Sequence, residues 1–247
     1  MKIIILLGAP GVGKGTQSTL ISQRYNIPII STGQLLRDIV NEQNNTTNGS
    51  TASTGISAES NHRGSAYNKI TSTIGSGKLV DDNLVTTILL DRLHNDDCKN
   101  GFILDGYPRT LDQVNNLNAT LHKILVHFNA KEQNQAIINL RLDDNTILSR
   151  LVGRFECSNC GAIYNKVHKK PIIDNQCDKC NGTEFEIRKD DEEKTIMKRI
   201  LVYKQETHDL IKVYSNKDFY KDIDANQDPD KIFNIINNFL QKRGFTP

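Results

Sequence analysis

The chain of 247 residues contains no tryptophan, and aromatic residues make up only 6% of it. Stacking of nucleic-acid bases on aromatic side chains is therefore not an expected mode of binding. Positive and negative charges nearly balance, with a formal net charge of +2. The overall charge gives no reason to expect a nucleic acid or a membrane as partner, so any site for an anion has to be local.

Long apolar runs are also missing. The longest run near the N-terminus, Ile3–Leu7, is far shorter than the ~18 residues of a membrane span. It is also shorter than the ~7–15 residues of a signal-peptide core, and no transit peptide precedes it. We expect a soluble, cytoplasmic protein without a membrane segment.

Cysteine is scarce, and its spacing is informative. Cys98 stands alone, and the other four form two Cys-x-x-Cys pairs: Cys157, Cys160, Cys177 and Cys180. Such pairs are typical of metal binding rather than of a secreted disulfide framework, and their spacing matches a four-cysteine zinc site. Four thiolates complete a tetrahedron without an open position, which indicates a structural zinc ion. Iron in the same sulfur cage is an alternative.

Short apolar runs alternate with helical stretches along the chain. Strands are expected at Lys2–Leu7, Pro28–Ile30, Phe102–Leu104 and Ala136–Leu142. Helices are expected at Thr16–Tyr25, Asp82–Leu93, Asp112–Leu117, Asp144–Val152, Glu192–Tyr214 and Asp228–Lys242. This alternation predicts an α/β fold of three layers, α/β/α, around a parallel sheet, with ligands beyond the carboxyl ends of the strands.

Two stretches interrupt the alternation. Asn41–His62 is polar and low in complexity, with Ile56 as its only large apolar residue. It cannot bury enough surface to offset its ordering entropy, so we expect a mobile surface loop. Phe155–Lys189 contains the four paired cysteines and is expected to form a small separate lobe.

The segment Gly8–Thr16 (GAPGVGKGT) follows an apolar strand and precedes a predicted helix, which is the setting of a phosphate-binding loop, or P-loop. Glycines let backbone N–H groups point at a phosphate, and the helix adds its positive end. Lys14 would bring a charge to the β- and γ-phosphates. The strict motif has Ser or Thr directly after the lysine. Here Gly15 precedes Thr16, which counts against direct magnesium ligation by this hydroxyl.

A P-loop is common to GTPase switches and ATPases, and it says nothing about the phosphoryl acceptor. A switch protein would be favoured by the guanine-reading motif Asn-Lys-x-Asp. The nearest candidates, at 165–168 and 68–71, both lack the aspartate. The sequence therefore does not favour a GTPase switch.

Asp105 ends the apolar run Phe102–Leu104 and precedes the segment GYPRT. A carboxylate at this place holds magnesium in P-loop enzymes, usually through water, although it could also simply cap a turn. Several arginines stand at loop–helix junctions: Arg37, Arg109, Arg150, Arg154, Arg188 and Arg199. In a chain with a net charge of only +2, this pattern indicates convergence on a polyphosphate.

Six segments, GAPGVGKGTQ, STGQLLR, GKLVDDNLV, LDGYPRT, RLVGRF and RKDD, occur in this order. Together they resemble the adenylate kinases of the long-lid type, over nearly the whole chain outside 41–70. The resemblance implies a core P-loop domain made of 1–30, 81–153 and 192–247. It also implies an inserted AMP-binding lobe at 31–80, with the polar insertion at 41–62, and a zinc-ribbon-like lid at 154–191.

The resemblance also implies site residues. It places ATP on Gly11, Val12, Gly13, Lys14, Gly15, Thr16, Arg154, Ile163, Tyr164 and Gln227. It places AMP on Thr32, Arg37, Lys78, Leu79, Val80, Gly106, Tyr107, Pro108, Arg109, Gln113, Arg188 and Arg199. The catalytic residues that it implies are Lys14, Asp105, Arg109, Arg150, Arg154, Arg188 and Arg199. Gln113 would read adenine through its amide, and Asp190 and Asp191 would position the lid arginines.

The implied activity is reversible, magnesium-dependent transfer of a phosphoryl group from ATP to AMP, which gives two ADP. No protein nucleophile is needed, because such transfer relies on positioning and charge stabilisation. A GTP:AMP phosphotransferase is the nearest alternative. A UMP/CMP kinase would be expected to have a short lid and another contact to the acceptor base. A non-catalytic P-loop regulator with a zinc-ribbon binding module is an alternative from another class.

The chain departs from the family's pattern at four places, one of which is that the glycine usual in the helix of the AMP-binding lobe is not clear around Tyr67. Gln34 stands where an aspartate is usual, so the carboxylate that would help to organise the magnesium waters is missing. Phe155 stands where a second arginine is frequent after the lid's Gly-Arg. The low-complexity insertion at 41–62 makes the AMP-binding lobe roughly twenty residues longer than is usual in the family.

Overall fold

A five-stranded parallel sheet forms the centre of the computed structural model, which describes the chain except residues 47–69, 71, 74–75, 77, 130–133 and 168. The strand order is β2-β3-β1-β4-β8, and every neighbouring pair is parallel. The strands are β1 (Lys2–Leu7), β2 (Ile29–Ser31), β3 (Gly101–Asp105), β4 (Asn134–Arg141) and β8 (Tyr220–Asp224). This confirms the α/β fold class.

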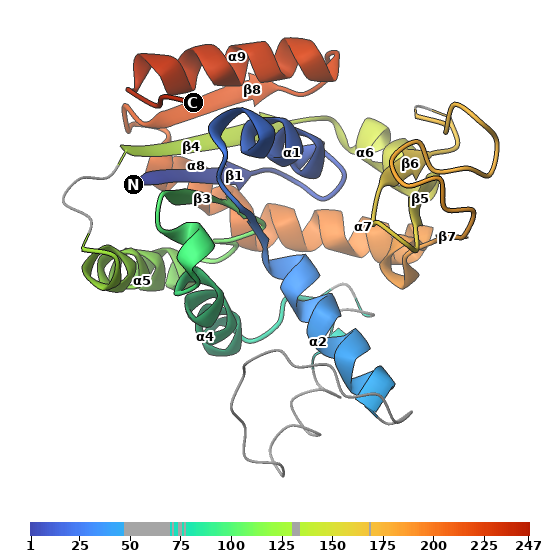
Figure 1. The fold of residues 1–247 in the computed structure, drawn as a ribbon, viewed down its shortest axis with the longest axis horizontal. Coiled ribbons are helices and arrows are strands. Elements are labelled where there is room, and N and C mark those ends of the chain that lie inside the picture. The colour runs from blue at the N-terminus through green and yellow to red at the C-terminus, as the bar shows by residue number, and fades with distance from the viewer. Residues whose placement is uncertain (47–69, 71, 74–75, 77, 130–133, 168) are drawn as a thin grey trace.

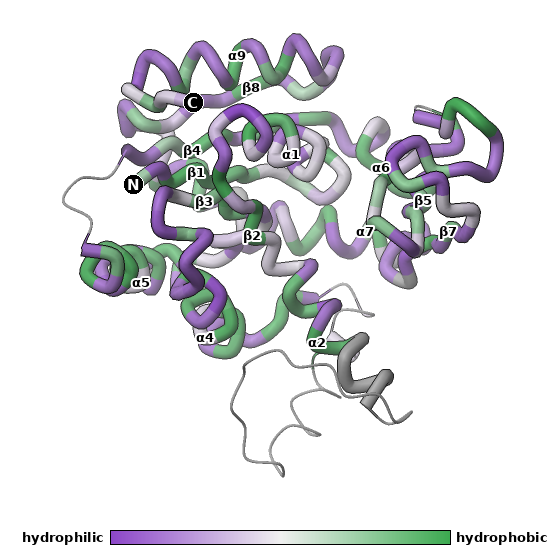
Figure 2. Tube along the Cα trace, viewed as in Figure 1, coloured by the Kyte–Doolittle hydropathy of each residue, from purple (hydrophilic) through white to green (hydrophobic). Residues whose placement is uncertain are grey.

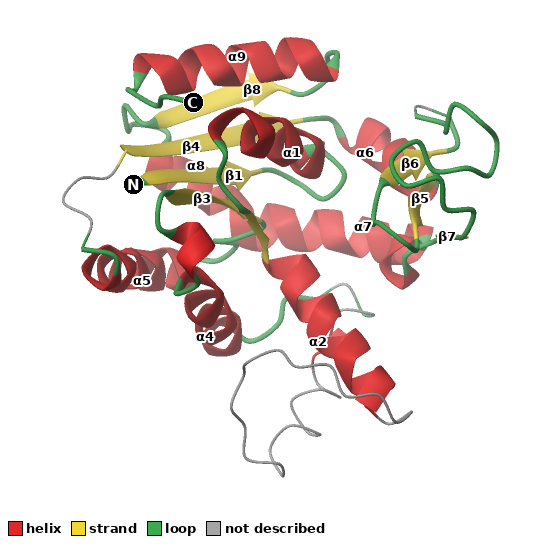
Figure 3. Cartoon of the chain, viewed as in Figure 1, coloured by secondary structure: helices red, strands yellow, loops and turns green. Residues whose placement is uncertain are grey.

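Helices cover both faces of the sheet because β1 is apolar on both faces (Figure 3). Ile3, Ile5 and Leu7 belong to one core with α4 (Asp82–Leu93), α5 (Leu111–His127) and α8 (His208–Tyr214). Ile4 and Leu6 belong to a second core with α1 (Lys14–Tyr25) and α9 (Pro229–Lys242). Successive side chains of a strand point to opposite faces, so one buried strand serves two cores.

The sequence of helix α9 explains why this helix packs with one side on the core and leaves the other side in solvent. Ile232, Ile236 and Leu240 recur at intervals of four residues and are buried, while hydrophilic residues alternate with them along the helix (Figure 2). Asp228 caps the helix by accepting a hydrogen bond from the Asp230 amide at 2.9 Å. An apolar stripe and a capped start together explain the boundaries of this helix.

A second, three-stranded antiparallel sheet lies apart from the first, at the right of Figure 1. Its order is β6-β5-β7, with β5 (Arg154–Cys157), β6 (Ile163–Asn165) and β7 (Phe185–Glu186). It is entered from α6 (Asp144–Val152) and left through the short turn Lys189–Asp191 and α7 (Glu193–Val202). Its buried core is small and includes two cysteines.

Three expectations from the sequence need correction. The single helix expected at Glu192–Tyr214 is α7, a π-helical segment Tyr203–Thr207 and α8, because one continuous apolar stripe does not reveal a change of helical pitch. Strand β8 was not expected, because this edge strand buries only one of its five residues, Ile223, and has no apolar run.

The third correction concerns the polar segment. The helix α2 (Thr32–Thr46) continues into the segment Asn41–His62, since glutamate and glutamine prolong a helix that has already begun. The rest of the expected mobile loop lies outside the described residues. A short 3-10 turn lies at Asp96–Cys98, before β3. Within the described part of the chain, no helix combines the length and the apolar character that crossing a membrane requires.

Candidate active site

A cleft of about 900 Å³ opens where the central strands end. The carboxyl ends of β1, β2 and β3 supply Leu7, Ser31 and Asp105 to its wall. Helices α6 and α7 and the second sheet contribute from the other side. Every residue that the sequence predicted for ATP, for AMP or for catalysis lines this cleft, except Tyr107.

Tyr107 lies in the hydrophobic core instead. Its side chain is fully buried. Its hydroxyl donates to the Gln113 carbonyl at 3.2 Å and lies 3.2 Å from the Thr86 hydroxyl. A motif letter does not reveal which way a side chain turns, so the sequence could not separate Tyr107 from its neighbours in the loop.

The P-loop connects β1 to α1 and depends on glycine geometry. Gly8, Gly11 and Gly13 have φ angles of 136°, 78° and 106°, which side chains other than glycine rarely adopt. A Cβ on Gly11 would also lie 2.7 Å from the Leu151 side chain. Gly13 precedes α1 and offers no side-chain cap, so the first backbone N–H groups of the helix are left for a ligand.

Lys14 folds back over this loop. Its Nζ donates to the carbonyl oxygens of Gly8 at 2.9 Å and Ala9 at 3.0 Å. Burial lowers the pKa of Lys14 to about 8, Asp105 opposes this effect, and three arginines, Arg109 foremost, add to it. Asp105 offsets only part of the effect that lowers the Lys14 pKa. A bound anion would therefore stabilise the protonated lysine.

Arg109 approaches the P-loop from the loop after β3. Its Nε donates to the Gly106 carbonyl at 2.7 Å, and its own carbonyl accepts from the Thr207 hydroxyl at 2.9 Å. Burial, and then the nearby Arg199, lower its pKa. Sequence reasoning missed Thr207, because it belongs to the π-helical segment, 98 residues away in the chain.

The arginines that come from the lid side are held by carboxylates. Arg154 makes two hydrogen bonds of 2.6 Å to the two oxygens of Asp191. Arg199 lies 2.9 Å from Asp190 and 3.2 Å from Asp191. The two-point contact fixes the plane of the Arg154 guanidinium, and the carboxylates restrain Arg199 through its Nη1.

Arg150 and Gln227 line the cleft near the end of β8. The Arg150 guanidinium donates to the Ala225 carbonyl at 3.3 Å, and burial lowers its pKa. The Gln227 amide donates to the Asp224 carbonyl at 2.9 Å. Both residues are thus tied to the end of β8, a strand that the sequence did not predict.

The part of the cleft for which the sequence predicted AMP lies between α2 and the loop after β3. The Thr32 hydroxyl donates to the Gly106 carbonyl at 3.0 Å. Arg37 donates to the side-chain oxygen of Gln34 at 2.8 Å. Burial, and then the charge of Arg188, lower the pKa of Arg37 to about 10. Two arginines from separate lobes therefore share a region that favours an anion.

Gln113 is 2% exposed at the start of α5. Its side-chain oxygen accepts from the Arg109 backbone N–H at 2.7 Å, and its nitrogen donates to Asp82 at 2.7 Å. Asp82 also accepts from the Thr110 hydroxyl at 2.6 Å. The role of Asp82 was not predicted, because the two residues are 31 positions apart.

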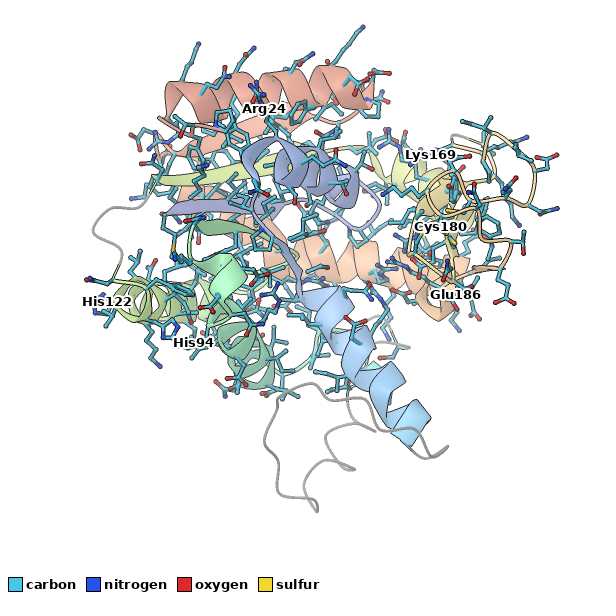
Figure 4. The ribbon with its side chains drawn as sticks, in the orientation of Figure 1. Arg24, His94, His122, Lys169, Cys180 and Glu186 are labelled. Carbon is cyan, nitrogen blue, oxygen red and sulfur yellow. The ribbon has the colours of Figure 1, made fainter. Side chains whose placement is uncertain are left out.

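The four paired cysteines meet in the small sheet. Their sulfur atoms all lie within 4.8 Å of one another, with Cys157–Cys180 at 3.6 Å and Cys160–Cys177 at 3.5 Å. A tetrahedron of Zn–S bonds of ~2.3 Å requires sulfur atoms roughly 3.8 Å apart. Figure 4 shows the sulfur of Cys180 turned into this lobe. The donor set and its size fit a structural zinc ion.

Both cysteine turns have the same backbone design. The amide of Gly161 donates to the Cys157 carbonyl at 2.8 Å, and that of Asn181 donates to the Cys177 carbonyl at 2.9 Å. Gly161 and Asn181 both have positive φ, at 67° and 59°. Two equivalent turns therefore present two sulfur atoms each to one centre.

A family model described as adenylate kinase matches residues 6–219. The chain belongs to the adenylate kinase family. It is similar to the adenylate kinases of Archaeoglobus fulgidus, at 36% identity with 97% of this chain and 98% of the relative covered, and of Syntrophotalea carbinolica, at 40% with 91% and 92% covered. A third relative, the adenylate kinase of Thermoanaerobacter sp., is 36% identical, with 98% and 99% covered. The resemblance inferred from the six segments is confirmed.

Two departures from the adenylate kinase pattern now have a structural setting. Phe155 stacks on Tyr164 at a centroid distance of 5.7 Å and meets Phe185 edge-on at 5.4 Å. Gln34 donates to Asp38 at 2.7 Å while it accepts from Arg37. Phe155 adds apolar packing to the lid. Gln34 links Arg37 to the carboxylate of Asp38, one helical turn after Gln34.

Proposed function

We propose that the chain catalyses the reversible transfer of a phosphoryl group from ATP to AMP, which yields two ADP. The observation that carries this proposal is one cleft in which Lys14 of the P-loop meets arginines from three parts of the chain: Arg37, Arg109, Arg150, Arg154, Arg188 and Arg199. Such a concentration of cations suits two nucleotides that meet through their phosphates.

ATP would place its phosphates on the P-loop. Gly11, Gly13 and the first turn of α1 offer backbone N–H groups, and Lys14 offers its charge. An arriving phosphate raises the pKa of Lys14, because it supplies the opposite charge that the buried amine lacks. The base and ribose would lie towards Ile163, Tyr164 and Gln227, which line the same cleft.

AMP would bind between α2 and the loop after β3. Its phosphate would meet Arg37, Arg109 and Arg188, and its base would meet Gln113. Thr32, Lys78, Leu79, Val80, Gly106 and Pro108 line the space between these ends. Attack by a phosphate oxygen of AMP in line with the leaving ADP needs no protein nucleophile.

Catalysis would consist of positioning and charge stabilisation. Negative charge spreads over the equatorial oxygens of the transferred group, and fixed arginines stabilise it without having to reorganise. Arg154 and Arg199 are held in place by Asp190 and Asp191 before substrate arrives. Closure of the lid at 154–191 would exclude water, which otherwise competes as an acceptor.

Two metal ions belong to this proposal. When bound with ATP, Mg²⁺ neutralises charge on the phosphates. Asp105 at the end of β3 lines the cleft beside Lys14, and its carboxylate chemistry fits a contact to the waters of that ion. Zn²⁺ would be held by Cys157, Cys160, Cys177 and Cys180 as a purely structural ion.

The same proposal divides the chain into a core domain (1–30, 81–153 and 192–247), an AMP-binding lobe (31–80) and a lid (154–191). The separate three-stranded sheet supports the boundary of the lid. We place the protein in the cytoplasm as a monomer, consistent with its small net charge and reduced cysteines.

The test is a matrix of purified protein with ATP or GTP as donor and AMP, CMP or UMP as acceptor, scored for diphosphate products. ADP from ATP and AMP, with little product from CMP or UMP, is the expected result. A preference for GTP with AMP would instead identify a GTP:AMP phosphotransferase. No product with any pair would overturn the proposed function.

A further inference from the structure

The strand β5 presents opposite chemistry on its two faces. Phe155 lies with the aromatic rings of Tyr164 and Phe185. Since neighbouring residues of a strand point to opposite faces, Arg154 and Glu156 share the other face. One positively charged and one negatively charged residue of the strand thus face away from the aromatic cluster.

Both of these charged residues pair with the segment that leaves the lid. Arg154 binds Asp191, and Glu156 accepts from the Arg188 Nε at 2.7 Å, with Nη2 of the same arginine at 2.5 Å. The strand supplies the cation, Arg154, in one pair and the anion, Glu156, in the other. The two ends of the lid are thereby joined twice.

The Glu156–Arg188 pair is largely removed from solvent. The side chains of Arg188 and Glu156 are 15% and 13% exposed. Of the two described residues, Arg188 lines the cleft and Glu156 does not. Glu156 therefore contacts the Arg188 guanidinium without itself lining the cleft.

The influence of Glu156 extends to the other lobe. Arg37 on α2 is affected by the positive charge of Arg188, which lowers its pKa, and by the negative charges of Asp190 and Glu156, which oppose that effect. Arg37 and Arg188 repel each other as long as no anion lies between them. A carboxylate bound to Arg188 offsets this repulsion and restrains the arginine where it lines the cleft.

We propose that Glu156 is a positioning residue of the AMP-phosphate site, acting through Arg188. The inference rests on the proposed function, in which Arg188 binds the AMP phosphate. With its Nε tied to Glu156, the guanidinium loses little rotamer freedom when a phosphate arrives. Without Glu156, Arg188 has to be ordered and aligned during binding.

The experiment compares the parent with Glu156→Leu, Glu156→Gln, Arg188→Lys and the double variant Glu156→Leu/Arg188→Lys. Glu156→Leu should lower kcat/KM for AMP about tenfold, because a misplaced group costs alignment. Glu156→Gln keeps an oxygen that accepts from Nε, so it should lose only about threefold. The matched control is Glu186→Gln, which removes the exposed carboxylate of the residue paired with Glu156 across β5 and β7.

Action through Arg188 predicts that the two changes are not additive. Once Arg188 is lysine, Glu156→Leu should cost no more than about twofold, while zinc content and the unfolding midpoint of Glu156→Gln stay at the parent value. Equal losses in both backgrounds, or a Glu156→Leu variant within twofold of the parent, would overturn the inference. If the leucine variant does not fold, Glu156→Gln decides: unchanged kcat/KM for AMP overturns the inference.

The parent assay separates this inference from the proposed function. A parent that makes no ADP from ATP and AMP overturns the function. Calorimetric binding of AMP still tests Glu156 in that case, because the glutamine variant should bind AMP about threefold more weakly through the loss of alignment. Equal affinity of parent and variant would refute the positioning role.

Discussion

Asp82 accepts a hydrogen bond of 2.7 Å from the side-chain nitrogen of Gln113, while the oxygen of the same amide accepts one of 2.7 Å from the Arg109 backbone. A carboxylate only accepts and a backbone N–H only donates, so together they determine which end of the amide is oxygen. One N–H and one lone pair remain for a ligand. Asp82 thus orients the residue that we propose reads adenine.

Asp82→Asn should weaken the discrimination between acceptor bases. Asparagine has one accepting oxygen, where the Asp82 carboxylate accepts from both Gln113 and Thr110, so one of the two contacts that orient the Gln113 amide is weakened. We expect KM for AMP to rise about tenfold and the preference for AMP over CMP to fall by a similar factor. Steady-state assays with each acceptor measure both quantities. Asp91→Asn, at an exposed site on the same helix, is the control, and an unchanged preference in Asp82→Asn would contradict the assignment.

Lys14→Met should abolish transfer and leave the fold intact. Loss of one fixed charge at the transferred group should reduce kcat by at least about 100-fold. The nucleotide-free protein should nevertheless become more stable at pH 7, by at most about 3 kcal/mol, because a buried ammonium is removed. A coupled ADP assay and urea unfolding measure the two effects. Lys123→Met on the exposed side of α5 should change neither, and near-normal turnover of Lys14→Met would refute the role of the lysine.

The stability difference between the parent and Lys14→Met should depend on pH. The folded-state pKa of Lys14, about 8, lies below its ordinary value of 10.5. The unfolded chain therefore binds more protons between these values, and the stability of the parent rises with pH there. The destabilisation by Lys14 is fully present below pH 8 and disappears as pH rises through 10.5. Urea unfolding of both proteins between pH 7 and 10.5 tests this, and a difference that does not change over this range would contradict it.

Removal of metal should unfold the lid and spare the core. The buried cluster of the lid consists of Cys157, Ala162, Tyr164 and Cys177, too few apolar groups to order the lobe without a metal ion. After chelation, amide exchange should accelerate in β5–β7 and stay slow in β1 and β4. Metal analysis of the untreated protein should find about one zinc per chain.

Cysteine variants provide the matched comparison for the metal site. Cys160→Ser should lose the ion, because three thiolates no longer close the tetrahedron. Cys98→Ser should keep it, since Cys98 lies in the main core beside Arg92. Full zinc content in Cys160→Ser would show that the four sulfur atoms do not form the site.

Local sequence was sufficient for the features that depend on neighbouring residues. The apolar run of β1, the glycines of the P-loop and the spacing of the cysteines each predict a structure from consecutive positions, and the fold class followed from their order. Prediction was wrong where structure and polarity do not change together. The helix becomes π-helical at 203–207 without a change in polarity, and α2 continues although the sequence becomes polar.

The tertiary structure alone decided which distant groups meet. Asp82 with Gln113, Thr207 with Arg109, and Glu156 with Arg188 are pairs separated by 31, 98 and 32 positions. Motifs identify residue types in order, and helical or strand periodicity reports only which face a residue occupies. The direction of a side chain and its partner depend on how sheets and helices pack, as the burial of Tyr107 beside cleft-lining Pro108 shows.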